Sequence, residues 1–242
     1  MTSIVLLHGA FNELWGPNEL ASRWVPALQD GVWHAGVTID RSDVTVCFYG
    51  DLFRRQPETD DAAEWTAKRA DVEDMLADMA GTDALHALNE VAGKETYDRT
   101  VDMFTMMAED PTLADKVKHR LLDAMSDDTC VLIAHSLGTV VAVRALTDHP
   151  DIAIDTLITM GSPLGAGPFA NFCDGKHPAG VRRWVNIVAT TDPVAAAGRV
   201  PGLFGSGVEE HLVDNGHRGH AAEPYLNSAQ VGHAVAGALA VN

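Results

Sequence analysis

A serine stands at the point where an apolar run gives way to a helical pattern. Residues 131–141 read VLIAHSLGTVV, and Ser136 has Ala134 and Gly138 two residues away on either side. A serine on a sharp turn between a buried strand and a helix exposes its Oγ as a nucleophile, and small neighbours let the turn close. The next backbone N–H, that of Leu137, lies at a helix N-terminus and can stabilise an oxyanion. An ordinary serine that caps a helix is the alternative, but the strand, turn and helix together favour a nucleophile.

The Ser136 segment and three other motifs resemble α/β-hydrolases, particularly their compact lipase-like and esterase-like members. The serine pattern is A-x-S-x-G, which departs from the family's G-x-S-x-G at Ala134. In chain order the four motifs are His8-Gly9, the Ser136 turn, Gly161-Ser162-Pro163-Leu164-Gly165, and Asp192 followed by His220. The resemblance covers about residues 1–50 and 129–242, and the Ser136 turn is its specific element. It implies a mostly parallel central sheet flanked by helices.

The family order of serine, acid and histidine implies where the acid lies. The strand-like run 183–189 is followed by Asp192, which would accept a hydrogen bond from the histidine and hold its tautomer. The alternative for Asp192 is a turn aspartate before proline, which is a common arrangement. Asp174, on an earlier loop, is the rival acid.

The same order implies that the base precedes the last helix. Residues 215–221 read NGHRGHA, so His217 and His220 both qualify. We select His220 because its loop continues into the final helix as in similar hydrolases, and His217 is the alternate. A metal site at this pair is disfavoured because both histidines lie on a loop and no cysteine ligand stands nearby. His135 is expected to point away from Ser136 and to be structural.

The resemblance also implies the second half of an oxyanion hole after the first strand. There the backbone N–H of Ala10 would join that of Leu137, and Gly9 would allow a close approach. His8 is interpreted as structural, and a plain turn at the end of a strand is the alternative for the whole motif. The implied mechanism is nucleophilic attack by Ser136 with His220 as base, and it needs no metal or organic cofactor.

The elements that must position these residues can be read from the apolar runs. Strands are predicted at 4–7, 44–49, 129–134, 156–160 and 183–189, with a weaker one at 209–213. Helical patterns separate most of them, and a final helix is predicted at about 228–240. Strands that alternate with helices indicate a parallel α/β sheet. Together with the resemblance, this pattern implies one hydrolase domain over residues 1–242.

Residues 51–128 interrupt this alternation and are predicted to form an inserted helical cap. Helices are expected at 61–80, 83–92 and 95–108, and another starts at Asp110-Pro111. The segment holds 20 of the 34 acidic residues and six of the eight methionines. The acidic residues suit a solvated outer face. The methionines either form ordinary core or line an adaptable apolar pocket, and core is the usual outcome for an apolar helix stripe.

Composition limits the partners. The net charge of −17 disfavours binding of nucleic acid and of anionic lipid. The chain has three cysteines, Cys47, Cys130 and Cys173, and their spacing matches no metal-binding pattern. Because their number is odd and a disulfide framework is not evident, we expect no structural disulfide. No signal peptide or membrane-spanning stretch is recognised, and we predict a cytoplasmic protein without stable membrane association. The sequence sets no oligomeric state.

Three functions are consistent with these residues. The first is a serine hydrolase that cleaves carboxylic esters of a small acyl substrate. The second is an acyltransferase or cyclase that uses the same residues in a biosynthetic pathway, because both reactions share the acyl-enzyme. The third is a hydrolase-fold binding protein without catalysis, which the complete serine, acid and histidine set disfavours.

Overall fold

The computed structural model describes residues 4–54, 62–80, 94–195 and 198–241. Its centre is a six-stranded sheet in which every neighbouring pair of strands is parallel. Across the sheet the strands are β2 (Val44–Cys47), β1 (Ile4–Leu7), β3 (Val131–His135), β4 (Ile154–Met160), β5 (Val181–Ala189) and β6 (Val208–Val213). The predicted parallel α/β sheet is thereby confirmed.

The boundaries of the strands differ slightly from those predicted. β2 ends at Cys47 rather than at residue 49, because the chain turns into a short 3₁₀ helix, η2 (Gly50–Phe53). β4 and β5 each begin two residues earlier than expected, at Ile154 and Val181. Apolar runs locate a buried strand well, but pairing with the neighbouring strand sets its ends.

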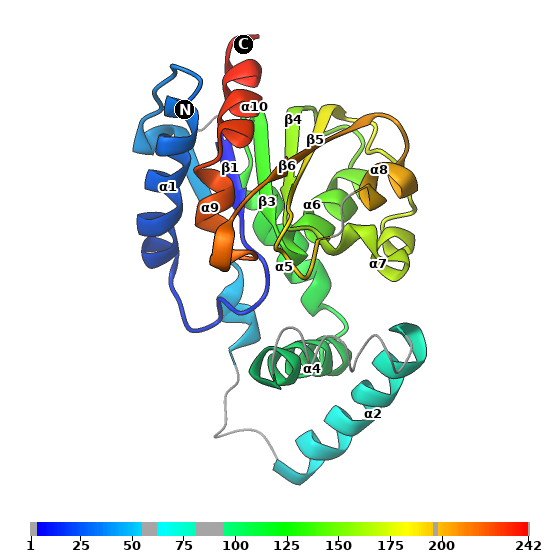
Figure 1. Cartoon of the computed structure of the whole chain (residues 1–242). Helices are drawn as coiled ribbons and strands as arrows, with labels where there is room; N and C mark the ends of the chain where they lie inside the picture. Colours follow the sequence, from blue (N-terminus) through cyan, green and yellow to red (C-terminus); the bar gives the residue numbers. More distant parts are fainter. Residues whose placement is uncertain (1–3, 55–61, 81–93, 196–197, 242) are drawn as a thin grey trace.

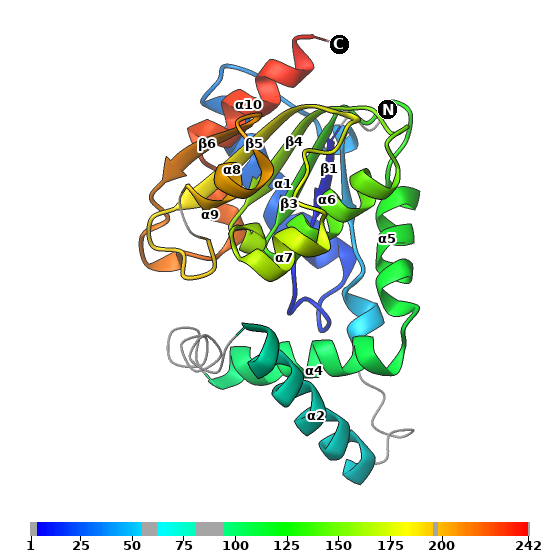
Figure 2. The ribbon, with the colours of Figure 1, turned by 90° about the vertical axis from the view of Figure 1, so that its right-hand side faces the viewer.

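Helices cover both faces of the sheet (Figures 1 and 2). On one face lie α1 (Pro17–Trp33), α9 (Ala222–Leu226) and α10 (Ala229–Leu239). On the other lie α5 (Leu113–Ala124), α6 (Leu137–Asp148), α7 (Gly167–Phe172) and α8 (Arg199–Phe204). Alternate residues of one strand enter different cores, since Ile4 packs under α1 and α10 while Val5 packs under α6. Burial on both faces explains why β1 is a continuous apolar run.

Two further helices lie beyond the end of the sheet at which the strands finish (Figure 1). They are α2 (Ala62–Ala80) and α4 (Lys94–Glu109), which contact each other. The helix expected at 83–92 lies outside the described residues. α5 begins at Leu113 rather than beside Pro111, because the Asp110 carboxylate accepts the N–H of Thr112 and holds a turn there. α5 packs against β2 and α6, so this part of segment 51–128 flanks the sheet.

Candidate active site

Ser136 occupies a strained turn between β3 and α6. Its φ of 55° and ψ of −132° lie in a region that residues with side chains rarely adopt. Its N–H donates to the carbonyl of Met160, the last residue of β4. Its own carbonyl accepts the Thr139 hydroxyl at 2.7 Å, and Thr139 bonds the buried Ser162 hydroxyl at the same distance. The neighbouring strand and the helix therefore hold the turn from both sides.

Two glycines let other segments approach this turn. A Cβ added at Gly138 would meet the carbonyl oxygen of His8 at 2.3 Å, so the first turn of α6 requires glycine. A Cβ at Gly9 would meet Ser136 Cβ at 2.6 Å and lie 3.1 Å from its Oγ. The loop after β1 thus lies directly against the serine. Ala134, where the family pattern has glycine, is fully buried in β3 and fits there.

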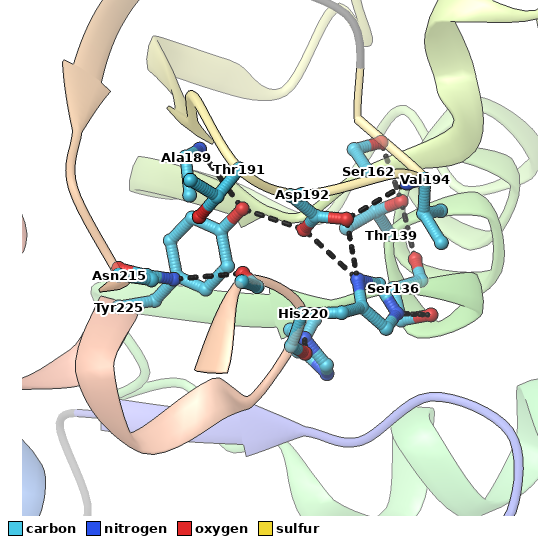
Figure 3. Close-up of polar contacts among 12 residues, drawn as sticks. Ser136, Thr139, Ser162, Ala189, Thr191, Asp192, Val194, Asn215, His220 and Tyr225 are labelled. Atoms are coloured by element: carbon cyan, nitrogen blue, oxygen red, sulfur yellow. Dashed lines mark hydrogen bonds and ion pairs between the residues drawn. The ribbon is translucent and has the colours of Figure 1, made fainter. Parts of the chain in front are cut away.

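Ser136, His220 and Asp192 form a continuous hydrogen-bonded series (Figure 3). His220 Nδ1 lies 2.9 Å from each carboxylate oxygen of Asp192, and its Nε2 lies 2.9 Å from Ser136 Oγ. With the proton on Nδ1, the unprotonated Nε2 accepts the serine hydroxyl, as a general base must. These residues are brought together from positions after β3, β5 and β6. Their catalytic role stays a prediction.

The carboxylate of Asp192 has two further donors. The Tyr225 hydroxyl donates to Oδ2 at 2.6 Å, and the N–H of Val194 donates to Oδ1 at 2.8 Å. Burial by itself would raise the pKa of Asp192, but its hydrogen bonds and the charge on His220 hold that pKa below the usual value. The fully buried Asp192 side chain therefore stays ionised beside the imidazole.

Tyr225 is a site residue that the sequence analysis missed. Its oxygen also accepts the N–H of Ala189, the last residue of β5. Tyr225 therefore links β5, the Asp192 loop and α9. Its partners lie 33 and 36 residues earlier in the chain, so no local pattern pointed to it. Thr139 and Ser162 both lie in segments that the sequence analysis singled out, but it gave neither side chain a role, and their mutual bond joins residues 23 positions apart.

The backbone of His220 is held by two other side chains. His135 Nε2 lies 2.9 Å from the His220 carbonyl and donates to it. Burial lowers the pKa of His135 to about 3, so the ring is neutral at pH 7. Asn215 Nδ2 donates to the carbonyl of Gly219 at 3.0 Å. His135 is structural, as predicted, in that it positions the loop of the candidate base without a hydrogen bond to Ser136.

The two predicted oxyanion donors flank the serine. Leu137 is the first residue of α6, and Ala10 lies in the loop after β1. Among the residues that the structure describes, neither backbone N–H donates a hydrogen bond. Both are thus available to a ligand oxygen.

The loop that carries Ala10 is fixed by buried contacts. His8 Nε2 accepts the N–H of Tyr49, and its Nδ1 donates to the Gly9 carbonyl. The Tyr49 hydroxyl donates to the His8 carbonyl, and the Asn12 amide donates to the carbonyls of Gly9 and Ala10. Burial lowers the pKa of His8 to about 4, which keeps this ring neutral as well. The structural interpretation of His8 agrees with these contacts.

The alternative candidates for the base and the acid, His217 and Asp174, lie away from Ser136. His217 is exposed in η4 (Gly216–Arg218) and bonds neither Ser136 nor Asp192. Asp174 is exposed after α7, where it lies 3.8 Å from Arg144. The geometry therefore favours His220 and Asp192 over the residues that sequence reasoning kept beside them.

A pocket of about 400 Å³ adjoins the serine through Gly9 and Ala10. Its apolar lining comes from the β1 loop, η2 and α4, and consists of Phe11, Leu14, Tyr49, Phe53, Met103 and Met106. A larger, more open hollow of about 910 Å³ lies between α1, β6 and α9. Neither hollow is lined by Ser136, His220 or Asp192 themselves. We assign the smaller pocket to the site because Gly9 lines it, and a Cβ added at Gly9 would lie 3.1 Å from Ser136 Oγ.

Within the described ranges, no group of three or more histidine, cysteine, aspartate or glutamate residues could hold a metal ion. None of the described helices combines the length and the apolar character needed to cross a membrane. The cysteines, all of which lie in the described part of the chain, form no disulfide, and Cys47 and Cys173 are buried.

Comparison with known proteins does not assign the chain to a family. No protein-family model matches it, and no curated protein matches it. The geometry around Ser136 is therefore the basis for assigning a function.

Proposed function

We propose that this protein is a serine hydrolase of the α/β-hydrolase family that cleaves carboxylic esters. The observation that carries the proposal is the series from Ser136 through His220 to Asp192, with 2.9 Å between each pair of bonded atoms. A serine on a strained turn, an imidazole and a buried carboxylate in this order are the parts of an acyl-transfer triad. The parallel sheet, which positions all three at the ends of its strands, is compatible with that family.

In the proposed reaction, Ser136 Oγ attacks the acyl carbonyl while His220 Nε2 takes the hydroxyl proton. The N–H groups of Ala10 and Leu137 stabilise the oxyanion, and Asp192 stabilises the imidazolium. His220 then protonates the leaving alcohol, which departs as the acyl-enzyme forms. Water, deprotonated by His220, attacks the acyl-enzyme and releases the acid and free Ser136. Protein groups alone supply each of these steps.

The pocket beside Gly9 suits the apolar part of a small substrate. Six apolar side chains line it, and two of them, Met103 and Met106, come from α4. Methionine adapts readily to ligands of different shape. In this proposal α2 and α4 act as a helical cap, and the methionines of α4 serve the pocket rather than the core alone.

Covalent labelling tests the proposal. A fluorophosphonate reacts with an activated serine, and mass spectrometry identifies the modified residue. We expect an adduct on Ser136 in the unaltered protein and no adduct in Ser136→Ala. Ser22→Ala is a matched control, since it removes an exposed hydroxyl on α1 outside the site and should leave labelling intact. A folded, unaltered protein without an adduct on Ser136 would overturn the proposal and favour a binding protein.

Product analysis separates hydrolysis from acyl transfer. An ester is supplied with water alone and then with a competing alcohol or amine. Free acid as the main product in both cases supports the hydrolase. A dominant transfer product at low acceptor concentration would replace it by the acyltransferase, which uses the same acyl-enzyme.

A further inference from the structure

The loop that carries the proposed oxyanion donor Ala10 contains a strained residue. Phe11 has a φ of 68°, a left-handed conformation that is uncommon for a bulky side chain. Such a conformation costs on the order of 1 kcal/mol or more and persists only where surrounding contacts hold it. The contacts of His8 and Asn12 fix the start of the loop. The carbonyl of Phe11 has a different partner, which lies far away in the sequence.

That partner is Arg99, in the middle of α4. Its Nη2 donates to the Phe11 carbonyl at 3.0 Å, and its Nε donates to Glu13 Oε1 at 3.1 Å. The guanidinium carbon lies 4.8 Å from the centroid of the Phe11 ring. One side chain thus contacts the backbone, the ring and the following carboxylate of the same loop. A planar guanidinium can make these contacts together, whereas an ammonium cannot.

The contact is more shielded than an ordinary surface ion pair. The side chains are 31% exposed for Arg99 and 20% exposed for Glu13, and both residues line the pocket beside the serine. Exposed pairs contribute little to stability, typically under about 1 kcal/mol. The position of this pair matters more, because the same guanidinium also bonds the carbonyl of Phe11, the residue that follows Ala10.

We propose that Arg99 is a positioning residue of this active site, which holds the Ala10–Phe11 loop in the conformation that stabilises the oxyanion. This inference rests on the proposed function. It makes helix α4 part of the catalytic arrangement as well as a wall of the pocket. An oxyanion donor acts on the transition state, so its displacement should lower kcat more than it changes KM.

The test compares Arg99→Met with a matched control, Arg144→Met. Arg144 also bonds the carbonyl of a phenylalanine, Phe172, at 3.0 Å, lies 5.6 Å from that ring, and pairs with Asp148. It makes these contacts between α6 and the end of α7, outside the proposed machinery. Two measurements are made on both variants: kcat and KM for an ester, and the rate of amide hydrogen exchange in the peptide that covers residues 9–13.

For Arg99→Met we expect kcat to fall by about 10- to 100-fold, because small displacements of a catalytic group cost about this much. KM should change by less than about threefold, and exchange in residues 9–13 should be faster. Arg144→Met should change neither quantity. Arg99→Lys, which keeps the charge beside Glu13, should give a smaller loss of kcat and controls for a variant that fails to fold.

Two outcomes overturn the inference. Unchanged exchange in folded Arg99→Met would mean that Arg99 does not hold the loop, whether or not any ester is cleaved. Faster exchange with unchanged kcat would mean that the loop is held but that catalysis does not depend on it. If the unaltered protein neither labels at Ser136 nor cleaves an ester, the proposed function is wrong. The exchange measurement then still shows whether Arg99 holds the loop of residues 9–13.

Discussion

Two regions of the molecule are held together by different means. One is the end of the sheet at which the strands finish, around Ser136, which we call the sheet edge. The other is the pair of helices α2 and α4. At the sheet edge, Asp192 is completely buried and accepts from His220, Tyr225 and a backbone N–H. Between the helices, Arg69 of α2 bonds Asp98 and Asp102 of α4, and within α2 it bonds Glu73; these carboxylate side chains are all about one-third exposed.

This difference indicates a division of roles. Buried hydrogen bonds keep their strength in salt and fix geometry closely, whereas exposed ion pairs are weak and screened. Changes at the sheet edge should therefore alter the chemistry, and changes between the helices should alter mainly their association. Arg99 connects the two regions, because it extends from α4 to the Phe11 loop.

The largest effect is expected for the candidate base. His220→Gln should lower kcat/KM for ester hydrolysis by about 10⁴-fold, because removal of a triad member leaves only the oxyanion hole and binding. His217→Gln, in the same loop but exposed, should stay within about twofold. Steady-state kinetics of the two variants make the comparison. Equal losses in both would refute the assignment of the base.

The next effect concerns stability and pH. Folding lowers the pKa of His135 to about 3 and that of His8 to about 4, from 6.5 in the unfolded chain. Between the folded and unfolded pKa values, the unfolded state binds more protons than the folded state. The contribution of these histidines to the free energy of unfolding is therefore fully present above pH 6.5 and decreases as the pH falls below it. From pH 7 to pH 5 each histidine should cost about 2 kcal/mol.

Urea unfolding at the two pH values measures this loss. The unaltered protein should lose roughly 4 kcal/mol and His135→Gln about half of that, since glutamine keeps the amide donor to His220 but does not titrate. The same pH dependence in both proteins would contradict the buried, neutral state of His135. Both histidines belong to the sheet edge, so this test measures how far buried neutral groups, rather than exposed ion pairs, stabilise that region.

A smaller effect is expected for Tyr225→Phe. Asp192 would lose one donor, and the buried N–H of Ala189 would lose its acceptor. The unfolding free energy should fall by about 1–3 kcal/mol, and kcat by about tenfold. Tyr97→Phe removes a hydroxyl from α4 and should leave kcat unchanged. If the two variants behave alike, the proposed difference between the regions is wrong.

The smallest effect is expected between the helices. Arg69→Met should lower the unfolding free energy by about 1 kcal/mol at low salt and by less in about 1 M NaCl, where ion pairs are screened. The kcat of this variant should stay within about twofold of the original. Urea unfolding at both salt concentrations provides the measurement. A tenfold loss of kcat would show that the ion pairs of Arg69 also hold the site.

Much of the fold and of the candidate site could be predicted because their signals are local. The strand Ile4–Leu7 is apolar at every position, as burial on both faces requires. Ser136 was recognisable because the turn, the strand before it and the helix after it are contiguous in the sequence. His220 and Asp192 needed the family order in addition, since spacing alone left His217 and Asp174 as candidates.

The rest was decided by tertiary structure. Tyr225 bonds Asp192 across 33 residues, and Arg99 contacts Phe11 across 88. Neither residue stands in a local pattern, because an arginine or tyrosine in a helix has many possible partners. The sequence by itself therefore determined the sheet and the nucleophile candidate, whose signals lie within single elements. Only the folded chain decided which histidine meets the serine and what holds the surrounding loops, because those contacts form between elements that packing brings together.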